Sequence, residues 1–288
     1  MLQSIVRAAI LMLAGVFVCA QAQWLNYPAP GTPRTRDGKA NLSAPSPRAF
    51  HGKPDLSGVW QIESPPAGEI ERLVGPVVGA ALRDAAVEAD DPREFSKYFF
   101  NILADFKPED TPMRSQTAER LRQRRSQGPI INTESHCLPM GIPRASLITA
   151  PFKIIQAPSE TVIIYEADNT HRQVHTDGRK LPVDPEPSWL GYSVGRWEAG
   201  ILVVETAGLN DKALLDAFGH PRSESTHMIE RFRRRDFGHM EIEITIDDPA
   251  NYTGPFTIKF NCRLLPDTDI LESFCNENEK DLRHLGVQ

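Results

Sequence analysis

Two histidines and two glutamates in the second half of the chain have the types and spacing that proton transfer needs. His220 and His227 flank a polar segment, and Glu230 follows on the next expected strand between apolar residues of the same face. Glu205 has a similar position on an earlier strand. A carboxyl group on an apolar face either pairs with a cation or has a raised pKa, and a raised pKa suits a general acid. One hypothesis therefore makes His227 or His220 the base and Glu230 or Glu205 the acid.

The alternative is that these carboxylates pair structurally with arginine. His171 and His175 lie four residues apart on an expected strand and share one face, so Arg172 takes the other face. Because histidines are commonly partly exposed, we expect their face to point outward and Arg172 to point inward. A buried cation needs a carboxylate partner, and the structural interpretation pairs Glu205 or Glu230 with Arg172, Arg179 or Arg231.

A third interpretation is a binding site. Polar side chains on the same strands and their connecting loops are expected to line the mouth of a cavity and to orient a small, partly apolar ligand. These ligand-binding residues are Arg172, Asp177, Arg179, Asn210 and Arg231. The residue types alone do not decide between binding and a cofactor-free lyase, isomerase or hydratase.

The histidines also allow a metal hypothesis. Two of His171, His175, His220 and His227 could join one of the carboxylates as ligands, as in a facial triad. The sequence contains no H-E-x-x-H motif, no cysteine–histidine ligand spacing and no aspartate-rich calcium loop. We therefore assign no metal ligands and no cofactor, and keep the metal-dependent site as a further alternative.

Ser193 lies in a G-x-S-x-G pattern, Gly191 to Gly195, which is typical of a nucleophile elbow. That elbow needs a strand before the serine and a helix after it. Here a second strand pattern follows instead, so Ser193 is expected to be structural. The two glycines allow a barrel strand to bend.

The elements that must position these residues are short strands separated by turn residues. Strand patterns occur at 54–62, 152–157, 161–167, 170–176, 192–197, 201–206, 227–235, 240–246 and 256–264. Met240, Ile242, Ile244 and Ile246 alternate with polar residues, which predicts one buried face. Repeated short strands with turn signals predict a mainly β chain, an antiparallel meander closed or half-closed as a barrel.

Residues 65–128 interrupt the strands with a helical pattern and are expected to form an insertion that packs on the sheet or covers it. Helical spacing occurs over 77–89 and over 92–106, where the aromatic residues form one stripe. Thr111 followed by proline predicts the start of a further helix that ends near Gly128.

The N-terminus has the features of a signal peptide over 1–22. Arg7 precedes an apolar run, and Ala20 to Ala22 gives a small-x-small cleavage site. The run is shorter than the roughly 20 apolar residues of a membrane span, so we expect no membrane insertion after cleavage and a periplasmic or extracellular protein. Residues 23–53 are rich in Pro, Gly, Ser and Thr and are expected to be an extended or disordered leader. Residues 54–288 then form a single domain.

The charge pattern excludes one class of partner. The formal net charge is −6, and the basic residues form no block. Nucleic-acid-binding proteins need a basic patch, which is missing here. The expected partner is a small molecule, and the oligomeric state stays open.

Three cysteines follow the signal peptide. Cys262 shares a strand face with apolar residues, which predicts a buried thiol. Cys137 and Cys275 lie in loop sequence, so we predict that they form a disulfide that ties the start of the barrel to its end. For such a long loop, chain entropy gives about 4 to 5 kcal/mol of stabilisation.

Several motifs resemble known secreted proteins. Gly58-Val-Trp60 on the first expected strand resembles the Gly-x-Trp signature of lipocalins and the wider calycin group, and Gly195-Arg-Trp197 repeats it. Further motifs resemble a large family of secreted proteins of unassigned function from environmental bacteria: Pro54–Trp60, Cys137–Arg144, Thr176–Arg179, Gly195–Glu198, His227–Arg231 and Cys275–Asn278. The resemblance covers nearly the whole mature chain, implies a lipocalin-like barrel and supplies no activity. The helical insertion and the polar loops depart from true lipocalins.

Overall fold

The computed structural model describes residues 28–66, 68–80, 96–127 and 133–275. The predicted signal peptide lies outside this part of the chain. The strands are β1 (Gly58–Ile62), β2 (Phe152–Gln156), β3 (Glu160–Tyr165), β4 (Thr170–His175), β5 (Tyr192–Glu198), β6 (Ile201–Ala207), β7 (His227–Arg234), β8 (His239–Asp247) and β9 (Phe256–Leu264). The helices are α2 (Glu69–Val74), α4 (Lys97–Phe100) and α5 (Ser115–Ser126), with single 3-10 turns at Phe50–Gly52, Pro108–Asp110, Thr133–His136 and Arg144–Ser146. Within the described ranges, no helix combines the length and the apolar character needed to cross a bilayer.

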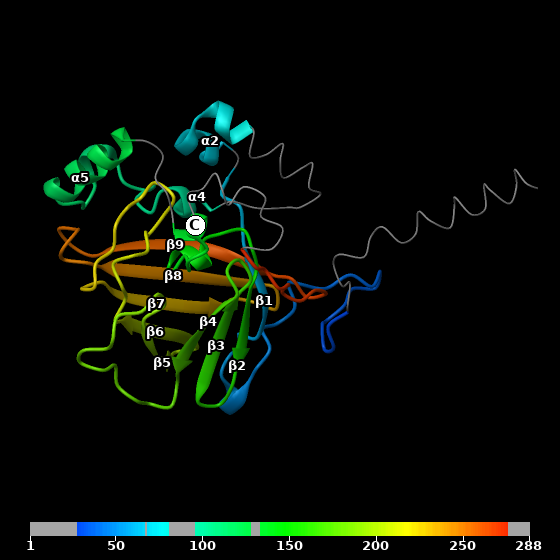
Figure 1. The fold of residues 1–288 in the computed structure, drawn as a ribbon. Coiled ribbons are helices and arrows are strands. Elements are labelled where there is room, and N and C mark those ends of the chain that lie inside the picture. Colours follow the sequence, from blue (N-terminus) through cyan, green and yellow to red (C-terminus); the bar gives the residue numbers. More distant parts are fainter. Residues whose placement is uncertain (1–27, 67, 81–95, 128–132, 276–288) are drawn as a thin grey trace, which may run out of the picture.

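The strands close into a barrel in chain order (Figure 1). Each strand pairs with the next, and β9 returns to β1, where Trp60 lies opposite Leu264. This closure confirms the prediction of a mainly β chain that forms a barrel.

One pair of neighbours departs from the antiparallel meander. β4 and β5 run parallel, and their register holds only two residue pairs, Val174 with Ser193 and His175 with Val194. Parallel neighbours cannot be joined by a tight turn, because the chain must first return to the other end of the sheet. Residues 176–191 make this return without a helix or a further strand of the sheet. The barrel wall is therefore paired only briefly at this place.

Strand alternation fills the barrel interior with apolar side chains. On β8, Met240, Ile242, Ile244 and Ile246 are buried and alternate with partly exposed residues, as predicted. Trp60 on β1 is fully buried in the same core. Burying one large aliphatic side chain contributes about 1.5–3 kcal/mol, so this interior is the main source of stability.

The segment between β1 and β2 packs over one end of the barrel (Figure 1). Its buried side chains Ile102, Leu103, Met140, Ile142 and Leu147 belong to the same hydrophobic core as the barrel interior. The insertion predicted over 65–128 thus covers the sheet, and its packing continues to Leu147.

The helix expected over 92–106 is shorter than its pattern indicates. The prediction of a helix over 92–106 is wrong, because only Lys97–Phe100 is helical in the described part of that range. Asn101 has an extended backbone, and Ile102 donates its amide to Asp216 at 2.6 Å instead of continuing the helix. A tertiary hydrogen bond therefore overrides the helical spacing.

The flanking helices also differ from their patterns. Residues 76–80 are helical, and the rest of the helix predicted over 77–89 lies outside the described residues. α5 begins at Ser115 rather than after Thr111. The reason is that Met113 forms an isolated β-bridge with Tyr252, which keeps this stretch extended.

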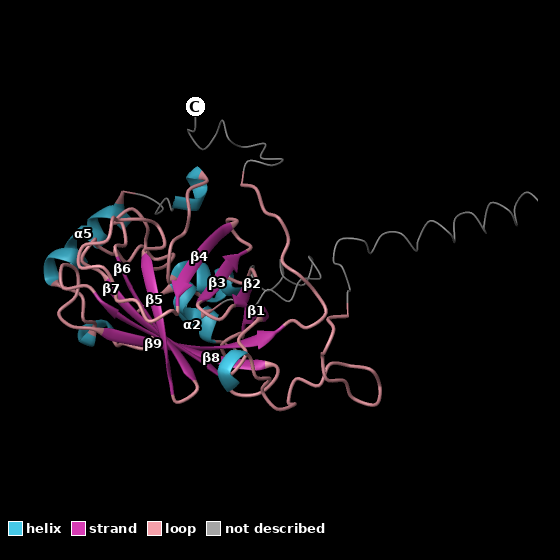
Figure 2. Cartoon of the chain, turned by 90° about the horizontal axis from the view of Figure 1, so that it is seen from below, coloured by secondary structure: helices cyan, strands magenta, loops and turns pink. Residues whose placement is uncertain are grey.

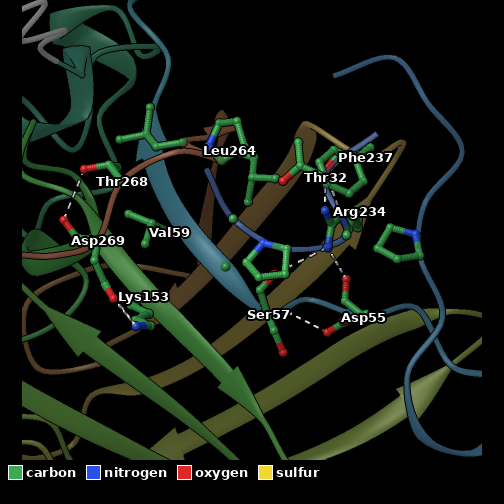
Figure 3. A pocket seen from close by; sticks show the side chains of 17 residues that line it. Thr32, Asp55, Ser57, Val59, Lys153, Arg234, Phe237, Leu264, Thr268 and Asp269 are labelled. Atoms are coloured by element: carbon green, nitrogen blue, oxygen red, sulfur yellow. Dashed lines mark hydrogen bonds and ion pairs between the residues drawn. The ribbon is translucent and has the colours of Figure 1, made fainter. Parts of the chain in front are cut away.

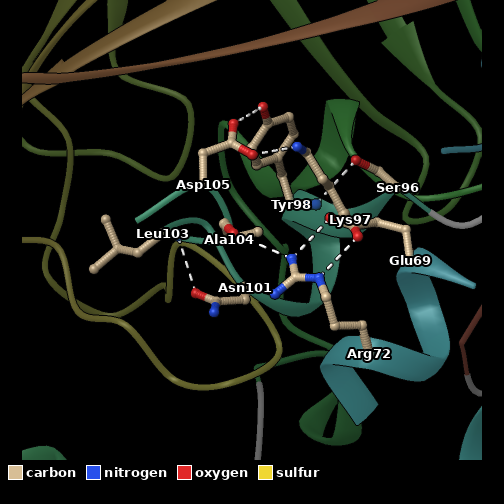
Figure 4. Close-up of polar contacts among 9 residues, drawn as sticks. All are labelled: Glu69, Arg72, Ser96, Lys97, Tyr98, Asn101, Leu103, Ala104 and Asp105. Atoms are coloured by element: carbon tan, nitrogen blue, oxygen red, sulfur yellow. Dashed lines mark hydrogen bonds and ion pairs between the residues drawn. The ribbon is translucent and has the colours of Figure 1, made fainter. Parts of the chain in front are cut away.

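Polar contacts join α2 to the α4 region within the insertion (Figure 4). Arg72 of α2 donates to the Ala104 carbonyl at 3.2 Å. The Tyr98 hydroxyl donates to Asp105 at 2.5 Å, and Lys97 forms an ion pair with the same carboxylate. Burial and the Asp105 carboxylate raise the pKa of Tyr98 above its ordinary value, so this phenol stays a hydrogen-bond donor at neutral pH.

The leader lies against the barrel from residue 28 onward. The backbone carbonyls of Leu42 and Ala44 accept hydrogen bonds from the amides of Gly238 and Phe237 in the β7–β8 turn. Figure 2 shows this N-terminal segment and α5 at opposite ends of the strands. The leader therefore covers the barrel end that the helical insertion leaves open.

Cys137 and Cys275 form a disulfide, which confirms the predicted pairing. The bond joins the segment before β2 to the segment after β9 across 138 residues. Cys262 is a free thiol in the barrel core. Burial raises the pKa of Cys262 well above its ordinary value, so the thiol stays protonated and unreactive.

Candidate functional site

The barrel wall is only briefly paired along one seam, where a cavity of about 500 Å³ lies between β4 and the segment leading into β5. β5 pairs with β4 only at the C-terminal end of β4, so within the described residues 170–173 have no strand partner on the side opposite β3. Consecutive residues from Asn169 to Gln173 line this cavity. Since neighbouring side chains of a strand point to opposite faces, a cavity lined by consecutive residues faces the strand's backbone edge. This seam cavity therefore offers backbone amide and carbonyl groups to a ligand.

Aromatic side chains form one wall of the seam cavity. Trp189 and Tyr192 line it, and the Tyr192 ring lies 5.2 Å from the His175 ring, centroid to centroid. Arg179 donates to the Tyr192 hydroxyl at 3.1 Å and holds both carboxylate oxygens of Asp177. The hydrogen bonds from Arg179 lower the pKa of Asp177 to about 2. Asp177 and Arg179, two of the predicted ligand-binding residues, thus hold Tyr192 in place but do not line the cavity themselves.

A buried ion pair lies behind the seam cavity. Arg172 points into the barrel and pairs with Glu230, and each side chain is 1% exposed. Arg172 also donates to the hydroxyls of Ser193 at 2.9 Å and Thr206 at 2.6 Å. Burial by itself lowers the pKa of Arg172, but the charges of Glu230 and Tyr165 and the hydrogen bonds to them together outweigh burial, and the net pKa is raised. The carboxylate partner that an inward Arg172 requires is present.

Ser193 belongs to this buried cluster. Its hydroxyl contacts Arg172 and Thr206, and β6 follows β5 through a tight turn at Ala199 and Gly200. The helix that a nucleophile elbow needs is therefore not formed in this part of the described chain. The arrangement agrees with the structural role expected for Ser193.

The outer wall carries the histidine–carboxylate pair of the acid–base hypothesis. His227 Nε2 lies 2.9 Å from Glu205 Oε1, and both side chains are 34% exposed. Arg196 approaches the same carboxylate at 3.5 Å. Glu205 shares its strand face with Ile201 and Val203 as expected, but that face is turned outward. The pair faces solvent and lines none of the cavities described here.

Replacing His227 by alanine should therefore leave ligand binding at the seam cavity unchanged. An exposed ion pair contributes about 0–1 kcal/mol, so the free energy of unfolding should fall by no more than that. Urea denaturation and ligand titration of the variant check both expectations. A loss of binding equal to that of a seam-cavity variant would move the site to the outer wall.

Two further predicted residues lie buried in the connection between β6 and β7. His220 Nδ1 lies 2.5 Å from Asp216, whose carboxylate also accepts the Ile102 amide of the insertion. Asn210 accepts hydrogen bonds from Arg222 at its backbone oxygen and at its side-chain oxygen. These contacts fasten the connection beneath the insertion. Sequence reasoning missed Asp216 and Arg222, and the only local signal was the spacing of Asp216 four residues before His220.

The predicted ligand-binding residues do not line one common cavity mouth. These residues are Arg172, Asp177, Arg179, Asn210 and Arg231. Arg231 lies on the outer wall, 3.3 Å from Glu198. His171 and His175 are four residues apart on one strand, about 13 Å along its axis, which is too far to share a metal ion. Within the described ranges, no group of three or more His, Cys, Asp or Glu side chains is placed to hold a metal. The physical reason is that the strand residues alternate between the interior and the outer face of the wall, while Asn210 and His220 are buried in the connection between β6 and β7.

A second cavity, of about 600 Å³, lies where the leader meets the start of β1 and the end of β9 (Figure 3). Arg234 on its wall is 6% exposed and donates to the backbone carbonyls of Asp55 and Phe237. Its guanidinium lies 5.0 Å from the centroid of the Trp60 ring, a cation–π contact. The contacts of Arg234 thus stabilise this end of the barrel and leave its guanidinium without a ligand-binding role. We therefore place the candidate site at the seam cavity.

Tyr252 gives the loops beneath the insertion a pH dependence. It is buried, and its hydroxyl donates to the Pro221 carbonyl at 2.9 Å. Burial, together with the charges of Asp216 and Asp248, raises the pKa of Tyr252 well above its ordinary value. In the unfolded chain the phenol ionises near pH 10, so the stability linked to Tyr252 is present below that pH and is lost as the pH rises above it.

Replacing Tyr252 by phenylalanine should therefore flatten the alkaline loss of stability. The free energy of unfolding of the wild type should fall more steeply above about pH 10 than that of the variant, by about 1.4 kcal/mol per pH unit. Urea denaturation of both proteins between about pH 9 and about pH 11 measures the difference. Parallel curves would mean that the phenol ionises in the folded protein too.

Comparison of the chain with family models, with curated proteins and with solved structures gives no match. The resemblance of the sequence motifs to lipocalin-like secreted proteins is neither supported nor opposed by this outcome. Function is therefore inferred from the geometry of the seam cavity.

Proposed function

We propose that this protein binds a small, partly apolar molecule in the seam cavity and belongs to the lipocalin-like secreted proteins. The observation that carries the proposal is the backbone edge of β4, unpaired among the residues that the structure describes, beside Trp189 and Tyr192. Ligand pockets commonly combine aromatic walls with a few fixed polar groups. A flat, apolar body would lie against the rings, and its polar groups would reach the strand edge.

The charge balance of the cavity indicates the charge of the ligand. Arg172 and Ser193 line the seam cavity, but the Arg172 charge is compensated by Glu230 inside the barrel. Among the described residues the lining contains no carboxylate, and its other ionisable side chains are His171, His175 and Tyr192. A neutral ligand fits this lining better than an anion, because no uncompensated cation faces it.

The acid–base enzyme is the less supported function. The acid–base hypothesis pairs a histidine with a glutamate, and the pair of this kind that forms, His227 with Glu205, faces solvent on the outer wall. His220 is held by Asp216 beneath the insertion. Neither histidine lines the seam cavity, whereas a proton-transfer pair must reach the substrate at hydrogen-bond distance.

Export to the periplasm or the extracellular space is part of the proposal. The signal-peptide features of residues 1–22 support it. The disulfide Cys137–Cys275 is compatible with an oxidising compartment.

Titration with the neutral fluorescent probe N-phenyl-1-naphthylamine tests the proposed site. We expect saturable binding to the wild type and at least about tenfold weaker binding to Trp189→Ala, since an aromatic wall contributes more than about 1.4 kcal/mol. Mass spectrometry of small molecules released from the native protein then identifies the natural ligand, which should displace the probe.

His227→Ala is the control, because it alters the outer wall and leaves the seam cavity intact. It should bind the probe within about twofold of the wild type. Equal affinities of Trp189→Ala and the wild type would refute the assignment of the site. Far-UV circular dichroism of each variant shows that the barrel is folded.

A further inference from the structure

A cleft of about 430 Å³ separates α5 from the loops that cover the same barrel end. One wall is α5 and the other is formed by the β6–β7 and β8–β9 connections. Hydrogen bonds fix α5 near both of its ends. Arg114 donates to the Pro249 carbonyl at 2.8 Å, and Arg125 donates to the Phe218 carbonyl at 2.7 Å. The cleft is thus held between two docked ends of one helix.

The face of α5 that lines the cleft carries two arginines. Thr117, Arg120, Leu121 and Arg124 follow the three- and four-residue spacing of one helix face. Thr117 and Leu121 are buried and pack toward the loops. In the described part of the chain, neither Arg120 nor Arg124 has a carboxylate partner within 4.0 Å, whereas Arg122 on the other side of the helix pairs with Glu119.

The two lining arginines repel each other, and local effects do not explain both of them. Like charges four residues apart destabilise a helix. Arg124 near the C-terminus of α5 gains from the helix dipole, but this effect is confined to the last turn and does not reach Arg120. The pair is therefore better explained by a negative group between them than by helix stability.

The opposite wall of the cleft adds a third positive charge, Arg222, whose hydrogen-bond acceptors do not neutralise it. Arg222 is 2% exposed, and its guanidinium donates to the carbonyls of Asn210, Ile142 and Trp189. These acceptors are uncharged, and among the described residues Asp211 is the only carboxylate that lines the cleft. Burial lowers the pKa of Arg222 to about 10, which leaves it charged at neutral pH. The guanidinium is engaged by the loops, so it acts on the cleft through its field, and the buried Asp248 carboxylate behind Ser223 and Asn251 offsets part of that field.

The lining thus carries three arginines against one aspartate in a chain whose formal net charge is −6. We propose that this cleft binds a small anion that carries a phosphate or carboxylate group, with Arg120 and Arg124 as its direct ligands. Guanidinium groups bind both anions through paired, charge-assisted hydrogen bonds. The site is separate from the seam cavity and does not depend on the function proposed there.

Isothermal titration of the full protein tests the site with two probes, inorganic phosphate and citrate, against sodium chloride at equal ionic strength. We expect saturable binding of at least one probe. Arg124→Gln should weaken it about tenfold, and Arg120→Gln/Arg124→Gln should weaken it further, since each loses a charge-assisted hydrogen bond. Binding of phosphate alone or of citrate alone identifies the class of the natural anion.

Arg122→Gln is the matched control, because it removes the same charge from the same helix outside the cleft. It should change the affinity by less than about twofold. An equal loss in Arg122→Gln and Arg124→Gln would show general electrostatic attraction and overturn the proposal, as would the absence of saturation with both probes. Thermal melts of all three variants show that α5 remains docked.

Discussion

Replacing Glu230 by glutamine is expected to lower the free energy of unfolding by about 3–5 kcal/mol. The amide keeps the shape of the side chain but removes the charge that compensates Arg172 inside the barrel, where both side chains are 1% exposed. The hydroxyls of Ser193 and Thr206 hydrogen-bond to the guanidinium but cannot neutralise it. Urea denaturation followed by tryptophan fluorescence measures the loss.

The double variant Arg172→Met/Glu230→Leu shows whether the lost stability comes from an uncompensated buried charge or from lost packing. It removes both charges at similar volume, so most of the stability should return. Ser193 and Thr206 can still hydrogen-bond to each other, since their hydroxyls lie 2.9 Å apart. A Glu230→Gln protein as stable as the wild type would mean that water reaches the pair through the seam cavity.

Removing the disulfide with Cys137→Ser/Cys275→Ser is expected to cost about 5 kcal/mol of stability. The bond closes a loop whose ends are 138 residues apart, and the unfolded chain gains most entropy when a long loop is released. Guanidinium denaturation of the variant and the wild type measures the difference.

A reducing agent provides the control for the disulfide. It should destabilise the wild type and leave the serine variant unchanged, because Cys262, the other cysteine of the described residues, is a buried free thiol. Equal stability of the oxidised wild type and the variant would show that residual contacts in the unfolded chain restrict the loop as much as the disulfide does.

Strand alternation made the barrel predictable from the sequence. On β8 a single apolar face fixes both the strand and its orientation, since Glu241 and Glu243 on the other face must meet water. The inward direction of Arg172 followed from the same rule, because the histidines on one face of β4 are partly exposed and the residue between them must point to the other face. The disulfide followed by elimination once Cys262 was assigned to a buried face.

The orientation of Glu205 was not predictable in this way. β6 is apolar on both faces, and Val203 on the outer face is as fully buried as Val204 on the inner face. Apolar neighbours therefore do not tell which side of such a strand is the interior. His227 and Glu205 still meet at 2.9 Å, but on the wall that faces solvent.

The seam cavity was also beyond the reach of local patterns. The turn residues at Asp177 and Gly178 look the same whether the chain continues to an antiparallel or to a parallel neighbour. Only the pairing of β5 with β6 and of β4 with β3 decides where the crossover lies, and this depends on the whole sheet. Trp189 and Tyr192 become wall residues through that crossover.

The pairing of β1 with β9 has a consequence for the order of events during synthesis. Trp60 cannot meet Leu264 until nearly the entire polypeptide has emerged, so the last step of folding joins its most distant partners. Until then β1 and β8 each present an unsatisfied edge that could recruit another molecule. A chain that stops before residue 256 should therefore associate with itself rather than remain monomeric.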